Sequence, residues 1–239
     1  MYRENPSESM NWLYNEFQQV GRDYADKFEV QIYNETHSKF RDLKRESLDL
    51  IAALELSKED LLVDFGSGTG VFAIEAAQVC KQVFCVDISE EMLAYSQAKA
   101  DKKGITNMHF VHSGFLNFRL PDNNVSCITS TFSFHHLPDF WKKMALVNMN
   151  KMLHKNGKLY IKDVIIEEGT EVKNIDAFIQ EQAHLGGTFL KEDAELHFRE
   201  EFSTYDWIFE ELLRKAGFTI LEKKMEGGVI GSYFCCKAS

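Results

Sequence analysis

The sequence LLVDFGSGTG at residues 61–70 decides the fold of this chain. An apolar run ends on Asp64-Phe65 and opens into three glycines at every second position, Gly66, Gly68 and Gly70. Glycine at such a turn allows positive φ and lets backbone N–H groups approach a ligand that a Cβ would hinder. The stretch therefore predicts a strand followed by a nucleotide-binding turn.

A second acid stands at the end of the next apolar run. Residues 83–86 read VFCV, and Asp87 follows them. If the two strands are parallel neighbours, their carboxyl ends meet at one edge of the sheet, so the Asp87 carboxylate lies beside the glycine turn. Together the two strand ends describe a nucleoside pocket.

The glycine spacing indicates which nucleoside. A dinucleotide fingerprint reads Gly-x-Gly-x-x-Gly, and its third glycine position is Val71 in this chain. The pattern Asp-x-Gly-x-Gly-x-Gly instead resembles the first motif of the class I S-adenosylmethionine-dependent methyltransferases. SEEML at 89–93, LPD at 137–139 and KMLHKNGKL at 151–159 also look like stretches of that family. They are most similar to its small-molecule branch, which includes the ubiquinone and menaquinone biosynthesis methyltransferases.

The resemblance implies S-adenosyl-L-methionine as cofactor, with Asp87 matching the family's ribose-binding acid. Asp64 would orient the loop and meet the methionine ammonium, directly or through water. Ile88 and Met92 either pack on the adenine ring or belong to the core. The residues expected to contact the cofactor are Asp64, Gly66, Ser67, Gly68, Gly70, Asp87, Ile88, Met92, Gly114, Phe115, Thr131 and Tyr33, the last of which resembles a tyrosine that related enzymes fold over the cofactor.

One position departs from the family pattern. After the third strand many members place an acid that takes the adenine amino group, but the aligned stretch here reads HSGF at residues 112–115. Gly114 has no side chain to do this. Backbone groups of Gly114 and Phe115, or the Ser113 hydroxyl, are the substitutes that the sequence offers.

Methyl transfer from a sulfonium is an in-line displacement, so the protein mainly aligns the two reactants and excludes water. The sequence TFSFHH at 131–136 follows the fourth expected strand, and either histidine could be a general base. Ordinary hydrogen-bonded packing is the alternative for each. We predict His135 as the base, because His136 abuts Leu137-Pro138 and turns into the packing of the next helix. No His, Cys or Asp cluster has ligand spacing, so no metal is expected.

The alternation of elements predicts an α/β protein with a Rossmann-like, doubly wound, mostly parallel seven-stranded sheet and an antiparallel last strand. Residues 1–37 are expected to form an N-terminal helical segment, either a mobile lid or an ordinary packed helix, because Leu13, Phe17, Val20 and Tyr24 recur at helical spacing. Residues 38–239 are expected to form the Rossmann-like methyltransferase domain that the resemblance implies, in which 164–202 is an insertion that caps the active site. Helices are expected at 71–79, from 89 to about 104, at 139–154 and, opened by a capping box, at 203–215, with further strands at 108–112, 125–131, 158–163, 218–224 and 230–237.

Composition narrows the class of protein. The 239 residues carry a formal net charge of −10, which argues against a nucleic-acid partner. The five cysteines have no Cys-x-x-Cys spacing and fit reduced, buried residues of a cytoplasmic protein. No apolar run approaches membrane-spanning length and no leader pattern opens the chain, so neither membrane insertion nor export is expected. The sequence leaves the oligomeric state open.

These observations predict a methyltransferase that acts on a small, partly apolar or aromatic molecule. A protein or peptide methyltransferase is one alternative and would need an open acidic groove. A non-catalytic partner subunit that only binds S-adenosylmethionine is another. An NAD-type oxidoreductase shares the fold class but fails at Val71.

Overall fold

The computed structural model describes residues 12–18, 20 and 42–238. Its elements in chain order are α2 (Leu43–Ala53), β1 (Leu61–Phe65), α3 (Val71–Ala76), β2 (Gln82–Asp87), α4 (Glu90–Lys102), β3 (Met108–His112), β4 (Val125–Thr131), the short 3-10 helix η2 (Phe134–His136), α5 (Asp139–Met152), β5 (Leu153–Ile166), α6 (Glu171–Glu200), β6 (Thr204–Tyr205), α7 (Asp206–Lys215), β7 (Phe218–Glu226) and β8 (Ile230–Lys237).

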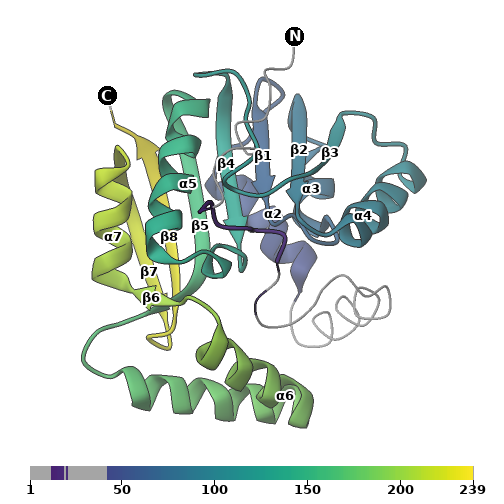
Figure 1. The fold of residues 1–239 in the computed structure, drawn as a ribbon. Helices are drawn as coiled ribbons and strands as arrows, with labels where there is room; N and C mark the ends of the chain where they lie inside the picture. The colour runs from purple at the N-terminus through teal and green to yellow at the C-terminus, as the bar shows by residue number, and fades with distance from the viewer. Residues whose placement is uncertain (1–11, 19, 21–41, 239) are drawn as a thin grey trace.

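The strands form one twisted sheet in the order β3-β2-β1-β4-β5-β8-β7, with β6 paired to β5 off this path (Figure 1). All pairs from β3 to β5 are parallel, and β8 runs antiparallel to both β5 and β7. The predicted seven-stranded, mostly parallel sheet with an antiparallel last strand is confirmed. The two-residue β6 is an addition that the sequence did not indicate.

Helices cover both faces of this sheet, so the strands are apolar on both sides. On one face α5 and α7 pack through residues such as Leu146 and Phe209, and on the other face α2 and α3 pack through Ile51 and Ala73. Within β1, Val63 belongs to the first cluster and its neighbour Leu62 to the second. Burial on both faces is typical of parallel sheets, and it leaves only the strand ends free to carry polar function.

Two local sequence features account for a helix cap and a turn. Ser89 is the N-cap of α4, and its hydroxyl accepts a hydrogen bond from the Met92 N–H at 3.1 Å. Gly227 and Gly228 join β7 to β8 with φ of 59° and 69°. Positive φ at both central positions is what a tight hairpin turn that matches the strand twist requires.

Two boundaries were predicted wrongly. The expected capping box at Ser203 is wrong because Thr204 belongs to β6, so α7 begins only at Asp206. The fifth strand was expected at 158–163. Instead β5 already begins at Leu153, and Asn156 takes a φ of 63° inside it, near a register shift against β4. Pairing with β4 extends the strand past a local turn signal.

The segment 164–202 begins as the last residues of β5 and continues as the long helix α6. Gly186 and Gly187 interrupt the helical backbone, with φ of −131° and 66°. The two parts of α6 lie below the sheet in Figure 1, past the carboxyl ends of the parallel strands. This is the side on which ligands bind in such folds.

The prediction of an N-terminal helix is wrong for the part of that segment that the structure describes. Residues 12–18 form turns and bends instead of a helix. Their side chains pack individually on the domain: the Trp12 ring stacks on Trp141 at 6.1 Å between centroids, and Phe17 meets His112 edge-on at 5.1 Å. Tertiary contacts therefore override the helical spacing. Tyr24 and Tyr33, and with them the lid hypothesis, lie outside the described residues.

Candidate active site

The glycine turn between β1 and α3 is built as the sequence predicts. Gly66, Gly68 and Gly70 have φ of 63°, 51° and 72°. The Gly66 N–H donates to the Val86 carbonyl at 2.8 Å and ties the turn to β2. A Cβ on Gly66 would lie 2.2 Å from the Ser133 hydroxyl, whereas a Cβ on Gly68 would meet nothing within 4 Å. Gly68 therefore faces open space, and a ligand can approach its backbone.

Asp87 closes this turn from the end of β2. Its Oδ2 accepts the Gly68 N–H at 2.7 Å, and its Oδ1 accepts the Ser89 N–H at 2.9 Å. Burial raises the pKa of Asp87, and these N–H donors offset part of that rise. Each carboxylate oxygen keeps a second lone pair, so the group can also accept hydrogen bonds from ribose hydroxyls.

Asp64 lies behind the turn. It is 6% exposed, and the Thr129 hydroxyl donates to its Oδ1 at 2.7 Å. Burial raises the pKa of Asp64 to about 7, and the neighbouring Asp87 charge adds to this. Asp64 does not line the cavity described below, so the geometry supports its role in orienting the turn more directly than a contact with the methionine ammonium.

A cavity of about 740 Å³ lies at the carboxyl edge of the parallel strands. We call the side formed by the glycine turn, the ends of β2 and β3 and the residues around 115 the cofactor half. Phe132 to His136, the end of β5, the β7–β8 turn region, α6 and Glu201 form the acceptor half. Of the predicted site residues, those that line the cavity are Gly66, Gly68, Asp87, Ile88, Met92, Phe115, Thr131 and His135. Asp64, Ser67, Gly70 and Gly114 lie behind its wall, and Tyr33 is outside the described residues.

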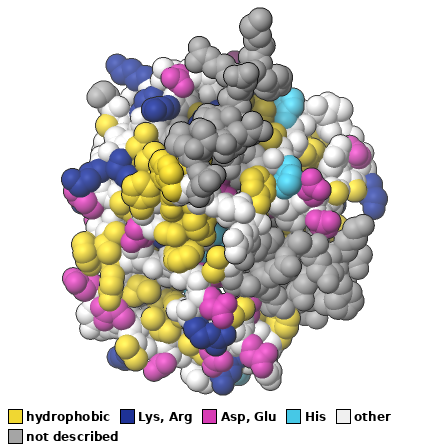
Figure 2. Space-filling model, viewed as in Figure 1, with side chains coloured by type: hydrophobic (Ala, Val, Ile, Leu, Met, Phe, Trp, Pro, Cys, Tyr) yellow, Lys and Arg dark blue, Asp and Glu magenta, His cyan; other side chains and the backbone are white. Residues whose placement is uncertain are grey.

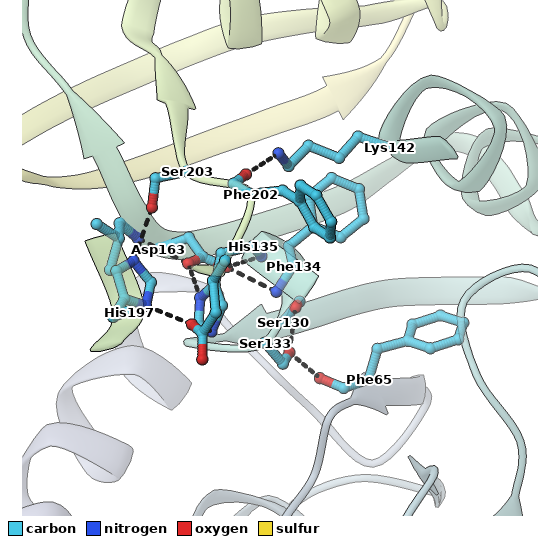
Figure 3. Close-up of polar contacts among 12 residues, drawn as sticks. Phe65, Ser130, Ser133, Phe134, His135, Lys142, Asp163, His197, Phe202 and Ser203 are labelled. Carbon is cyan, nitrogen blue, oxygen red and sulfur yellow. Dashed lines mark hydrogen bonds and ion pairs between the residues drawn. The ribbon is translucent and has the colours of Figure 1, made fainter. Parts of the chain in front are cut away.

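The acceptor half holds a buried polar chain centred on His135. The His135 Nδ1 lies 2.5 Å from Asp163 Oδ1, and its Nε2 lies 3.1 Å from a carboxylate oxygen of Glu201. Glu201 also pairs with the Nδ1 of His197, whose Nε2 meets the Ser203 hydroxyl at 2.7 Å. Figure 3 shows Asp163, His135, His197 and Ser203 converging from β5, η2, α6 and the segment after α6.

Backbone contacts hold this chain in place. The N–H groups of Phe134 and His135 donate to Asp163 Oδ2 at 2.7 and 3.2 Å. The Phe202 N–H donates to the His135 carbonyl at 3.0 Å, and the buried Lys142 ammonium donates to the Phe202 carbonyl (Figure 3). The segment after α6 is thus fastened to η2, which fixes Glu201 against the His135 ring.

The two histidines differ in protonation. Burial acts to lower the pKa of His135, but Asp163 and then Glu201 outweigh it and raise that pKa to about 9. Burial and the adjacent His135 charge lower the pKa of His136 to about 4. Near neutral pH, His135 is therefore an imidazolium between two carboxylates, and His136 is a neutral imidazole. Both rings line the cavity.

The base role of His135 stays a prediction, and the structure adds a condition to it. Both of its ring nitrogens already face carboxylates, so His135 can take a proton only after it has lost the one it carries and Glu201 has released it. Sequence reasoning also expected the His136 ring to turn into the packing, whereas the ring borders the cavity.

Sequence reasoning missed Asp163, His197 and Glu201. Asp163 had a signal, because it is an acid at the end of an apolar strand, as Asp64 and Asp87 are. Glu201 had none, since it reaches the site only through the path of α6.

Among the residues that the structure describes, one group has the proximity that a metal ion needs: ligand atoms of His135, His136 and Glu201 lie within 4.8 Å of one another. In the observed arrangement the His135 Nε2 is engaged with Glu201. The sequence expectation of no metal rested on spacing along the chain, which does not reveal a group drawn from η2 and a residue beyond α6.

A Rossmann-like sheet with a glycine turn and a carboxylate at adjacent strand ends offers a site for a nucleoside cofactor. A family model described as "Methyltransferase domain" matches residues 62–157. An uncharacterized methyltransferase from Geobacillus sp. (strain WCH70) is 26% identical over 207 residues, which cover 86% of this chain and 91% of the relative.

Solved structures agree on the fold. A SAM-dependent methyltransferase from Aquifex aeolicus has a TM-score of 0.62 and 18% sequence identity, and covers 89% of this chain and 99% of its own. A geranyl diphosphate methyltransferase in complex with GPP and sinefungin has a TM-score of 0.64 and 11% identity, and covers 81% and 77%.

The protein is a methyltransferase, an enzyme that uses S-adenosylmethionine as its cofactor. The cofactor half fits this molecule, because Gly68 offers open space at the turn and Asp87 offers acceptors for a ribose. Among the described residues, no helix combines the length and the apolar character needed to cross a membrane.

Proposed function

We propose that the protein transfers a methyl group to a small, partly apolar or aromatic molecule bound in the acceptor half. The observation that carries the proposal is that one cavity runs from Gly68 and Asp87 to a wall under α6 that combines a cluster of apolar side chains with polar and charged ones. Its volume of about 740 Å³ lies within the usual range of small-molecule sites. The apolar side chains of this wall include Phe132, Val164, Phe178, Leu190, Val229 and Ile230.

Phe132 supports an aromatic acceptor surface. It directly follows β4 and has a φ of 52°, in the left-handed region that a bulky residue rarely enters. The Phe132 N–H donates to the Lys162 carbonyl at 2.8 Å, which holds this backbone in place. Strained residues of this kind concentrate at functional sites. Here the strain turns an aromatic side chain toward the cavity.

In this proposal residues 164–202 cap the active site, and the N-terminal segment closes it from the other side. From α6, Phe178 and Leu190 reach the cavity, and from the N-terminal segment Tyr14 and Glu16 do. The Tyr14 hydroxyl donates to the His136 carbonyl at 3.0 Å. Such a cover excludes water while the sulfonium methyl is displaced.

His136 is the proton acceptor that we propose for an acceptor with an acidic proton. Its ring borders the cavity and is neutral near pH 7, since burial lowers its pKa to about 4. In this scheme His136 takes the place of His135, the base predicted from the sequence, and His135 acts as a positioning residue. Its charge is balanced by Asp163 and Glu201, so the ring stays fixed beside its neighbour.

A small acceptor is also supported by the resemblance to the quinone-biosynthesis branch, which stays part of the proposal. Acidic and basic side chains are interspersed on the face in Figure 2, which offers no basic stripe for a nucleic acid there.

Four of the five cysteines are buried and none is paired among the described residues, which supports a reducing, cytoplasmic location.

The test is a screen that follows S-adenosylhomocysteine release with quinol, phenol, thiol and amine acceptors and, in parallel, a peptide pool. We expect turnover with at least one small aromatic or apolar acceptor. Turnover with peptides alone would refute the small-molecule proposal in favour of a peptide methyltransferase. Tight cofactor binding without turnover on any acceptor would favour a partner subunit.

A further inference from the structure

Glu16 is a buried acid far along the chain from the rest of the cofactor half. It is 6% exposed, and the Leu116 N–H donates to its Oε1 at 2.8 Å. The side-chain amide of Asn117 donates to the same oxygen at 3.0 Å. A carboxylate from the N-terminal segment is thus docked on the turn that follows β3.

This carboxylate fills the place of a missing side chain. A Cβ on Gly114 would lie 2.6 Å from the Glu16 carboxyl carbon and 2.6 Å from its Oε2. No side chain fits at position 114 while Glu16 stays where it is. The glycine that departs from the family pattern is therefore the residue that makes room for Glu16.

The two carboxylate oxygens of Glu16 are not equally satisfied. Oε1 has two donors, whereas Oε2 is buried and has no hydrogen-bond partner among the described residues. Burial raises the pKa of Glu16 to about 7, although the amides of Leu116 and Phe115 and the charge of Arg119 oppose this. A buried acceptor without a donor is costly, and Glu16 borders the cavity from which a donor can come.

The position relative to Asp87 indicates which donor. Asp87 and His112 are opposite each other in the register of the parallel strands β2 and β3, and the Ser113 N–H donates to the Asp87 carbonyl at 3.0 Å. Glu16, which is docked on the turn after β3, therefore lies one strand away from Asp87, the acid expected to bind the ribose. Ile88 and Met92 border the same cavity as Asp87 and Glu16. If the ribose binds Asp87 and the base lies against these two side chains, the N–H donor on the edge of adenine is its amino group.

We propose that Glu16 accepts a hydrogen bond from the adenine amino group of the cofactor and so provides, from the N-terminal segment, the base recognition that Gly114 cannot. The proposal rests on the cofactor assigned above. Neighbouring contacts hold Glu16 in place, because Tyr14 is bonded to the His136 carbonyl and Phe17 packs on His112.

The test compares two ligands within each variant by calorimetry: S-adenosylhomocysteine and its 6-deamino analogue, in which hydrogen replaces the amino group. A charge-assisted hydrogen bond is worth roughly 10- to 100-fold in affinity, so the wild type should prefer S-adenosylhomocysteine by about that factor. Glu16→Ala should bind both ligands equally within about twofold, while the exposed control Glu59→Gln keeps the wild-type ratio. Because the ratio is taken within one protein, partial loss of folded protein cancels.

The 6-oxo analogue, S-inosylhomocysteine, tests the opposite arrangement, in which the ligand offers an acceptor oxygen instead of a donor amino group. Its oxygen faces the Glu16 carboxylate in the wild type, which should disfavour it, whereas the amide of Glu16→Gln can donate to that oxygen. We expect Glu16→Gln to bind this analogue better than the wild type does.

A second pair of variants transfers the carboxylate from position 16 to position 114. Gly114→Asp alone should weaken binding, because its side chain collides with the Glu16 carboxylate. In the Glu16→Ala background, Gly114→Asp should restore the preference for the amino group.

If Glu16→Ala keeps the wild-type ratio, or loses affinity for both ligands in the same proportion, Glu16 only docks the N-terminal segment and the proposal is wrong. If the wild type binds none of the three ligands, the cofactor assignment itself fails.

Discussion

The cofactor half and the acceptor half of the cavity are built in different ways. In the cofactor half, Gly68 and Asp87 lie 19 residues apart and are joined by one hydrogen bond between neighbouring strand ends. In the acceptor half, His135 is held by Asp163, which is 28 residues away, and by Glu201, which lies beyond the whole of α6. The first half is a local βαβ arrangement, and the second is assembled from distant segments.

This difference separates the chemistry that the fold supplies from the chemistry that is particular to this chain. A glycine turn and an acid at adjacent strand ends follow from the parallel sheet itself. The contact of Glu201 with His135 instead depends on His135 and Lys142 holding Phe202, and with it the segment after α6, against η2 and α5. Changes in the cofactor half should therefore alter cofactor affinity, and changes in the acceptor half should alter turnover, pH dependence or acceptor affinity.

The largest effect is expected at the histidine pair. His136→Gln should lower kcat by roughly 10² to 10⁴ for an acceptor with an acidic proton, because a neutral imidazole at the cavity is lost. The affinity for S-adenosylhomocysteine should change less than about threefold. Single-turnover rates and calorimetry measure the two quantities, and His154→Gln, at an exposed histidine near the start of β5, is the matched control.

The pH profile of kcat shows which histidine acts. With His136 as the base, the limb should lie near 4 and turnover should be flat from pH 6 to 8, since that ring is already neutral there. With His135 as the base, kcat should still be rising toward pH 9. The limb near 6.5 that an unperturbed imidazole gives is expected in neither case. A limb near 6.5 would contradict the observed environments of both rings.

The next effect belongs to the cofactor half. Asp87→Ala should raise the KM for S-adenosylmethionine by roughly 10- to 100-fold, because it removes charge-assisted acceptors for the ribose. These bonds are equally strong in the ground state and the transition state, so kcat at saturating cofactor should stay within about threefold of the wild type. Steady-state kinetics at several cofactor concentrations separate the two constants. A fall in kcat with an unchanged KM would place Asp87 in the acceptor chemistry and erase the distinction between the halves.

The sequence predicted the cofactor half more completely than the acceptor half, for a physical reason. Gly66, Gly68, Asp87 and the Ser89 cap are local signals, each readable within one turn and one strand end. Glu16 and Glu201 reach the site only through tertiary packing, so no spacing rule identifies them. The helical spacing of Leu13 and Phe17 was misleading, because the described part of the N-terminal segment is shaped by its contacts with the domain.

The free energy of unfolding should depend on pH through the buried charges of the acceptor half. The folded-state pKa of His135 is about 9, above its unfolded value near 6.5, so its contribution is fully present below pH 6.5 and is lost as the pH rises through 9. We expect the free energy of unfolding to fall on the order of 2 kcal/mol between pH 7 and pH 9.5. Asp64 and Glu16, with pKa values of about 7, are half protonated at pH 7 and add to the fall in the lower part of this window, so the upper part reports His135 most directly.

Denaturant titrations at several pH values measure this effect. His135→Gln removes the titrating group and should flatten the curve in the same window, whereas His154→Gln should leave it unchanged. An equally steep fall in His135→Gln would assign the pH dependence to other groups.

The smallest effect is expected at the apolar wall, where it bears most directly on the class of acceptor. Phe178 lies on α6, borders the cavity and is half-buried, so its ring can contact an acceptor without being essential to the core. Phe178→Ala should raise the KM for an aromatic acceptor by about 3- to 10-fold, the range for part of one apolar side chain. The Kd for S-adenosylhomocysteine should not change, because Phe178 belongs to the acceptor half. Phe189→Ala is the matched control, since this phenylalanine is also on α6 but does not border the cavity. If Phe178→Ala weakens cofactor binding and acceptor binding alike, α6 closes over both ligands together, and the two halves act as a single pocket.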